Sequence, residues 1–191
     1  MNAYNLKNPT VPTIPTTVDL DEALKGLQTR LAGLTWLSKS FARARNMKSQ
    51  LEGGANITEP KVYQGGSEYY PVLPNDALTA FSFMRTWGER RISEESQWQK
   101  SGMVEVTLDI IFWANLREVD RTKDYIFTDE LINESYHLIN SYPGVKVTRI
   151  FDEDFKDIYR GYDLVKTHTE KLIYPYASWR FETEFTHIIS C

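Results

Sequence analysis

The feature that most constrains the fold is a strict alternation of side chains over residues 103–113. Glu105 and Asp109 fall on one face of an extended chain, with the period of two that a β-strand requires. Towards the end of the segment, Ile111 and Trp113 make this face apolar too, so we expect that end to be buried on both sides. The other face is apolar throughout: Val104, Val106, Leu108, Ile110 and Phe112.

Shorter alternating patterns predict further strands. Residues 80–87 and 178–189 alternate apolar and polar side chains, and the second segment is rich in aromatic residues. The polar stretch before the long alternation is expected to form a protruding loop over about residues 88–102. Short strands are expected at residues 61–63, 69–73, 145–151, 162–165 and 172–174.

Two segments have the spacing of amphipathic helices. Apolar residues recur mostly every three or four positions over residues 19–47 and again over residues 128–141. Pro143 and Gly144 end the second segment. The first predicted helix has a cationic end, where positive side chains interact favourably with the helix dipole: Lys39, Arg43, Arg45 and Lys48.

This order of elements predicts an α+β fold, with a mainly antiparallel sheet and two principal helices packed on one face. The chain of 191 residues suits one compact domain, which we expect over residues 18–191. Residues 1–17 are expected to form an extended arm, because Pro9, Pro12 and Pro15 favour polyproline-like extension. The arm is either a disordered terminus or a contact along a neighbouring subunit.

Composition excludes several classes of protein. An apolar share of 41% and an aromatic share of 13% are enough to build a core, so the chain is not wholly disordered. Its longest apolar run, residues 110–114, is far shorter than the ~20 residues of a membrane-spanning helix, and no signal peptide is expected. A net charge of −4 argues against a dedicated nucleic-acid binder. We therefore expect a soluble, intracellular-type globular protein.

The sequence contains no motif that selects a reaction or a cofactor. His137, His168 and His187 match no metal-binding spacing, and the single cysteine, Cys191, cannot form an internal disulfide. The acidic run at residues 152–154 lacks the glycine and glutamate of an EF-hand loop. We therefore expect a protein that is not an enzyme and has no cofactor and no metal site.

One arrangement keeps a metal-dependent nuclease open as an alternative. Glu182 and Glu184 lie two residues apart and share a strand face, so they could hold a metal ion together with Asp109. This alternative requires the three carboxylates to converge within metal-ligand distance. The competing interpretation is the outward polar face of an alternating strand.

Aromatic side chains are abundant for one small domain, with 5 Trp, 11 Tyr and 9 Phe. A single core cannot enclose all of them, so we expect some at subunit contacts, where Tyr, Trp and Arg are enriched. For the group around Trp87, the alternative is a core tryptophan followed by ordinary loop charges. The candidate subunit-contact residues are Arg85, Trp87, Arg90, Arg91, Trp98, Pro9, Pro12 and Pro15.

The order of elements and the closing segment resemble one family. Residues 174–185 read Tyr-Pro-Tyr-Ala-Ser-Trp-Arg-Phe-Glu-Thr-Glu-Phe. They look like the final strand of the tail-terminator, or tail-completion, proteins of double-stranded DNA bacteriophages. Those proteins have an N-terminal helix, extended segments with proline, a long alternating strand, a second helix and a last aromatic strand. The segments that resemble them are residues 19–47, 61–87, 103–113, 128–141 and 178–189.

The resemblance implies a structural virion protein without catalysis. It implies a hexameric or dodecameric ring at the neck or tail, between portal and tail, in phages that include the crAss-like phages. The implied partners are other copies of the chain, adjacent neck, portal or tail proteins, and double-stranded DNA in transient passage, with no membrane. The implied location is the virion, after synthesis in the bacterial host cytoplasm. A small accessory domain that binds another protein through its aromatic surface is a further alternative.

Overall fold

The computed structural model describes residues 19–51, 54–93 and 101–190 of the chain. Within these ranges, no helix is long and apolar enough to cross a membrane. The predicted N-terminal arm and part of the predicted loop therefore lie outside the described residues. The candidate contact residues that fall there are Pro9, Pro12, Pro15 and Trp98.

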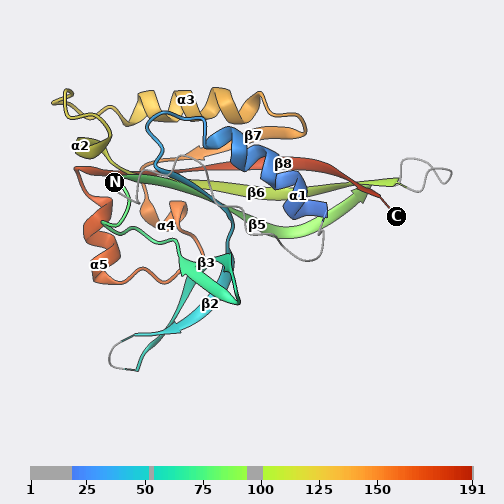
Figure 1. Cartoon of the computed structure of the whole chain (residues 1–191), viewed down its shortest axis with the longest axis horizontal. Helices are drawn as coiled ribbons and strands as arrows, with labels where there is room; N and C mark the ends of the chain where they lie inside the picture. Colours follow the sequence, from blue (N-terminus) through green and yellow to red (C-terminus); the bar gives the residue numbers. More distant parts are fainter. Residues whose placement is uncertain (1–18, 52–53, 94–100, 191) are drawn as a thin grey trace.

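The centre of the fold is a five-stranded sheet (Figure 1). Its strands are β1 Lys39–Arg43, β5 Ala80–Ser93, β6 Ser101–Asn115, β7 Val145–Phe151 and β8 Tyr176–Ser190. They are arranged in the order β1-β5-β6-β8-β7, with β1 parallel to β5 and every other pair antiparallel. The predicted α+β fold with a mainly antiparallel sheet is confirmed.

Two helices, α1 (Asp19–Leu31) and α3 (Thr128–Asn140), cover one face of this sheet (Figure 1). Leucines spaced along α1 pack with the apolar face of β6 and with α3 in one continuous core. Within this core, the rings of Phe112 and Trp179 stack with their centroids 5.2 Å apart. The apolar face of the long alternation thus lies beneath two helices, where its pattern predicted burial.

The opposite face of the sheet is covered by a small antiparallel sheet and by the segment that follows β7. The small sheet consists of β2 Arg45–Gln50, β3 Asn56–Gly65 and β4 Glu68–Pro71. The segment contains α4 Phe155–Ile158, α5 Lys166–Thr169 and the 3₁₀ turn η1 Glu170–Leu172. Ile111 and Trp113 are fully buried in this second core, so the predicted two-sided burial of the strand end is confirmed.

The helix predicted over residues 19–47 is wrong in its second half. α1 ends at Leu31, and a turn around Gly33 leads the chain into β1 and β2. The four cations expected at a helix end therefore lie on strands, and the buried guanidinium of Arg43 bonds Asp21 at 2.7 Å. The physical reason is tertiary: β1 takes its backbone hydrogen bonds from β5, a partner that local periodicity does not reveal.

Part of the stretch predicted as a loop, about residues 88–102, is strand instead. β5 continues to Ser93 and β6 begins at Ser101, so every described residue of that stretch lies on a strand. Cross-strand pairs such as Ile92 with Val104 extend the ladder there.

Residues 162–165 and 172–174 do not form the short strands predicted for them. The first stretch is irregular, and Leu172 ends η1. Tyr162 and Leu164 nevertheless pack on the second core. Their apolar spacing therefore reflects burial of irregular backbone rather than strand pairing.

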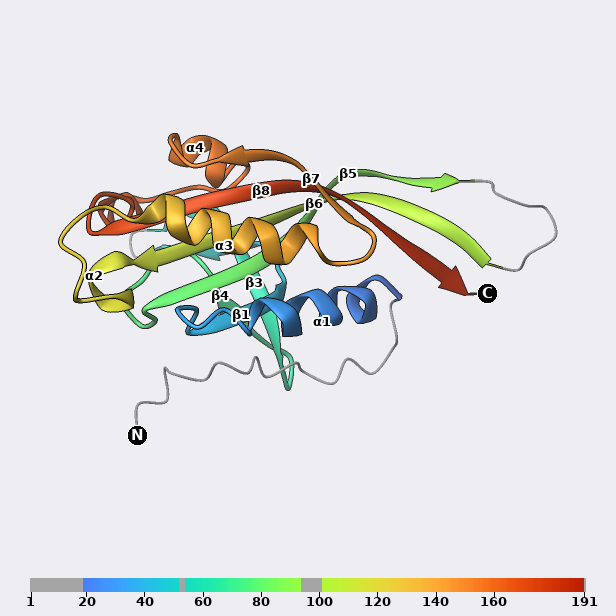
Figure 2. The same cartoon turned by 90° about the horizontal axis from the view of Figure 1, so that it is seen from above.

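The sheet is longer than the helices that cover it. Figure 2 shows β5, β6 and β8 running past α1 and α3 at one end of the long axis, here named the hairpin end (described residues within 87–106). The short helices α2 (Leu116–Val119) and α4 lie towards the other end. This second region is named the loop end (residues 116–130, 150–158 and 172–177).

Candidate functional site

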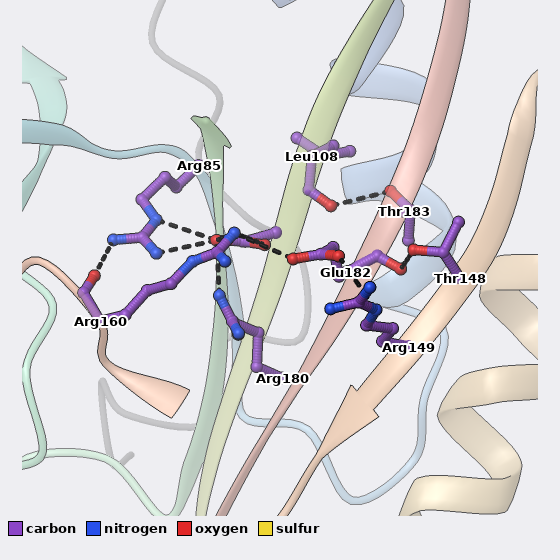
Figure 3. A network of polar contacts seen from close by, with 9 residues as sticks. Arg85, Leu108, Thr148, Arg149, Arg160, Arg180, Glu182 and Thr183 are labelled. Carbon is purple, nitrogen blue, oxygen red and sulfur yellow. Dashed lines mark hydrogen bonds and ion pairs between the residues drawn. The ribbon is translucent and has the colours of Figure 1, made fainter. Parts of the chain in front are cut away.

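The most polar feature of the interior is an ionic network centred on Asp109 (Figure 3). Asp109 lies on β6, directly opposite Arg85 of β5. It accepts hydrogen bonds from Arg85 Nε at 3.2 Å and Nη2 at 2.8 Å, and from Arg180 Nη1 at 3.0 Å. All three side chains are at most 2% exposed. Two buried guanidinium groups thus compensate one fully buried carboxylate.

Further contacts join the network to the loop after α4. Arg160 Nη2 lies 3.4 Å from Asp109 and 3.0 Å from Glu182, and its backbone carbonyl accepts a hydrogen bond from Arg85. Arg149 of β7 reaches Glu182 at 3.9 Å. The network therefore connects four strands of the main sheet to the segment that packs over them (Figure 3).

Aromatic rings and neighbouring charges also stabilise the guanidinium groups of this network. Arg85 and Arg160 both lie over the ring of Trp87, with their Cζ atoms 4.8 Å and 5.0 Å from its centroid. Burial lowers the pKa of the Arg180 guanidinium, and the negative charge of Asp109 opposes that shift. Each cation is thus held by a carboxylate, by a ring, or by both.

The three carboxylates of the nuclease alternative are each engaged by cations. Asp109 is bonded by arginines, Glu182 pairs with Arg160, and Glu184 pairs with Lys146 at 3.0 Å. Over the described ranges, no three His, Cys, Asp or Glu side chains gather closely enough to hold a metal ion. The ion pairs of Asp109 and Glu182 therefore join strands of the main sheet to the loop after α4.

The histidines stand apart from this network. His137 is exposed on α3, His168 lies half-buried on α5, and His187 is buried on β8. The acidic run at residues 152–154 forms the turn before α4, where the Asp154 carboxylate caps the helix. The structure therefore brings none of these predicted candidates together.

Large apolar side chains are exposed at the hairpin end. Ile92 on β5 is 66% exposed, and Trp87 and Met103 are exposed as well. Arg90 and Arg91 lie on the same stretch of β5 and also face solvent. Trp87, Arg90 and Arg91, three residues predicted at a subunit contact, are therefore all exposed on this part of β5.

The loop end exposes a second group of large apolar residues. Ile126 is 67% exposed and Ile173 is 69% exposed. The Arg117 guanidinium lies 5.3 Å from the centroid of the exposed Tyr174 ring. Exposed apolar and aromatic side chains beside an arginine are typical of protein–protein contacts. The other members of this group are Tyr125, Ile150 and Phe155.

Arg85 is the exception among the predicted contact residues that the structure describes. It is not on the surface, because Asp109 lies opposite it and binds its guanidinium inside the fold. The signal that could have identified this pair is the position of Asp109 on a strand face that becomes apolar two residues later. Arg160 and Arg180 carry no such signal, since their positions depend on the folding of distant segments.

Comparison with known proteins adds no family name to this description. The chain matches no protein-family model, and it matches no curated protein sequence. What the protein does is therefore inferred from its residues and their geometry.

Proposed function

We propose that this chain is a structural subunit of a ring at the neck or tail of a bacteriophage virion. Identical copies, hexameric or dodecameric, would join neighbouring portal, neck or tail proteins and surround the path of double-stranded DNA. The order of elements supports the proposal: a first helix, strands, the long strand β6, the helix α3 and the closing aromatic strand β8 follow one another as in tail-terminator proteins.

The observation that carries the proposal is the exposure of apolar side chains at both ends of the long axis. Ile92 at the hairpin end and Ile126 and Ile173 at the loop end are each about two-thirds exposed or more. A contact between two different surfaces of identical chains is head-to-tail, and it closes into a ring when the rotation between copies allows. Two unlike apolar surfaces on one chain suit that geometry.

Charge supports a channel role as well. A protein binds DNA more strongly with each phosphate that it neutralises, because counterions are released. The net charge of −4 suits a ring that lets DNA pass without holding it.

The direct test is the mass and shape of the purified full chain in solution. Light scattering and native mass spectrometry should give a hexamer or dodecamer, and electron microscopy should show a ring with a central opening. A monomer at the highest concentration reached would overturn the proposal and favour the accessory-domain alternative.

A further inference from the structure

A groove of about 140 Å³ lies between α1, β1 and β3. Phe41 and Ala42 of β1 and Val62 of β3 provide its apolar wall, and the exposed side chain of Gln64 lines it as well. β1 is the edge strand of the main sheet, so the groove follows an edge to which the described residues add no further strand. The groove is therefore open to an extended segment.

Two tyrosine rings stand beside this groove. Tyr63 lines it and is half-buried, and Tyr69, directly opposite in the β3–β4 ladder, is 42% exposed. Their ring centroids are 5.4 Å apart. Accessible aromatic rings along a groove are typical of surfaces that bind proline-rich segments in the polyproline II conformation.

The groove also contains a lysine without an acidic partner. Lys39 lines it, with Nζ 4.8 Å from the centroid of the Phe41 ring. Within the described part of the chain no carboxylate pairs with Lys39, and burial lowers the pKa of its ammonium group. A segment that offers carbonyl oxygens would supply hydrogen bonds there. A polyproline II segment does so, because its carbonyls make no internal hydrogen bonds.

The N-terminal arm has the sequence that suits such a groove. Residues 9–17 read Pro-Thr-Val-Pro-Thr-Ile-Pro-Thr-Thr. Three residues complete one turn of polyproline II, so the three prolines share one face and Val11 and Ile14 lie on a second. The third face consists of Thr10, Thr13 and Thr16. Two faces are thus largely apolar, and the arm contains no carboxylate side chain that would compete for Lys39.

The start of α1 lies beside the groove. Asp21, in the first turn of α1, accepts a hydrogen bond from Arg43 at the end of β1 at 2.7 Å. Further along the helix, Gln28 donates one to the Ser40 carbonyl at 2.8 Å, so α1 runs alongside β1 (Figure 2). Pro15 precedes α1 by four residues, which span at most about 14 Å when extended. The arm of a copy therefore reaches the groove of that same copy.

We propose that residues 11–15 dock in the groove of their own copy as a polyproline II segment, with the proline and Val11–Ile14 faces against the groove and the threonine face towards solvent. The dimensions agree, because successive prolines are about 9 Å apart and residues 39–42 of β1 extend about 10 Å. A tethered segment has an effective concentration of roughly millimolar, so a weak contact is enough. This inference goes beyond the proposed ring and does not depend on it.

Disulfide cross-linking in the full chain tests the docking. Ile14→Cys and Gln64→Cys are introduced together, with Cys191→Ser to remove the natural thiol. Mild oxidation should join them at least about tenfold faster than Ile14→Cys with Gln50→Cys, as followed by peptide mass spectrometry. Gln50 is the matched control, because it is exposed on β2 opposite Asn56, at the other end of β3 from Gln64. Equal rates would overturn the proposal.

Substitutions on two faces of the arm separate docking from mere tethering. In the chain with cysteines at positions 14 and 64, changing all three prolines to serine should slow the cross-link to the rate of the control pair. The matched set changes the threonine face to serine and should leave the rate unchanged. That set is Thr10→Ser, Thr13→Ser and Thr16→Ser. A proline set without effect, or equal slowing by both sets, would refute the docked orientation.

A mixture of chains with one cysteine each identifies the copy that supplies the arm. Ile14→Cys copies and Gln64→Cys copies join to each other only between chains, and the covalent heterodimer should form far more slowly than the disulfide within the double variant. A heterodimer that forms equally fast would overturn docking within one copy. The mass of the parent protein in solution is measured separately, so a monomeric parent refutes the ring and leaves this docking standing.

Discussion

Arg85 and Asp109 face each other across the β5–β6 ladder, with 2.8 Å between Arg85 Nη2 and Asp109 Oδ2 and both side chains removed from solvent. Directly opposite residues of antiparallel strands point to the same side of the sheet. The pair therefore places a carboxylate inside the fold, where Arg160 and Arg180 also reach it. Removal of Asp109 takes away the carboxylate that the buried guanidinium groups of Arg85 and Arg180 both bind, which is costly.

Asp109→Asn is expected to lower the free energy of unfolding by about 3–5 kcal/mol, because three guanidinium groups would surround a neutral side chain. Urea unfolding followed by circular dichroism measures this cost. The control is Asp157→Asn on the exposed side of α4, which should change stability by less than about 0.5 kcal/mol. A cost below about 1 kcal/mol for Asp109→Asn would contradict a stabilising role for the network.

Gly161→Ala should destabilise the protein by about 2–3 kcal/mol. Gly161 has φ +80°, and a Cβ there would come within 3.2 Å of the Trp87 ring, so the change combines backbone strain with crowding. Gly88→Ala isolates the first effect, because Gly88 has φ +74° and open space around its Cβ. Its expected cost is about 1–2 kcal/mol. Equal unfolding free energies for the two variants would show that Trp87 is not packed on residue 161.

The effect of Gly26→Ala on stability should depend on the side chain at position 142. Alanine favours a helix by about 1 kcal/mol over glycine, but a Cβ on Gly26 would overlap the Tyr142 hydroxyl. We therefore expect the substitution to destabilise the parent protein and to cost less in the Tyr142→Phe variant, where the ring Cζ atom would still lie 3.2 Å from the new Cβ. A double-mutant cycle on unfolding free energies should give a coupling of about 1 kcal/mol or more. Independent effects would mean that α1 is not in close contact with Tyr142, which follows α3.

The stability of the protein should depend on the titration of His168. Burial lowers the pKa of this histidine, and the charge of Glu59 opposes the shift. The unfolded chain then binds the proton more readily, so the stability due to neutral His168 is complete above the ordinary pKa of about 6.5 and is lost as the pH falls through and below it.

His168→Gln should flatten this part of the profile of unfolding free energy against pH. The matched control, Thr167→Gln, changes an exposed neighbour that does not titrate, and its profile should follow that of the parent protein. Parallel profiles for the parent protein and His168→Gln would show that the titration of His168 does not contribute to the pH dependence of stability.

Long and regular patterns were the predictable part of this fold. The alternation over residues 103–113 corresponds to β6, and the helical spacing over residues 128–141 corresponds to α3. The aromatic alternation over residues 178–189 corresponds to β8. In each case many consecutive residues share one period, so tertiary contacts change only the residues at which the strand or helix begins and ends. Residues 39–47 lack that length, and pairing with β5 and β3 overrides the helix predicted for them.

By itself, the sequence determined which face of β6 is apolar and which end of that strand is buried on both sides, because side-chain period reports burial directly. Only the tertiary structure decided that Arg85, Arg160 and Arg180 meet at Asp109, and that the surfaces around Ile92 and Ile173 lie at opposite ends of the molecule. The physical reason is that charge clustering and surface position depend on which distant segments pack together, and local periodicity contains no record of that choice.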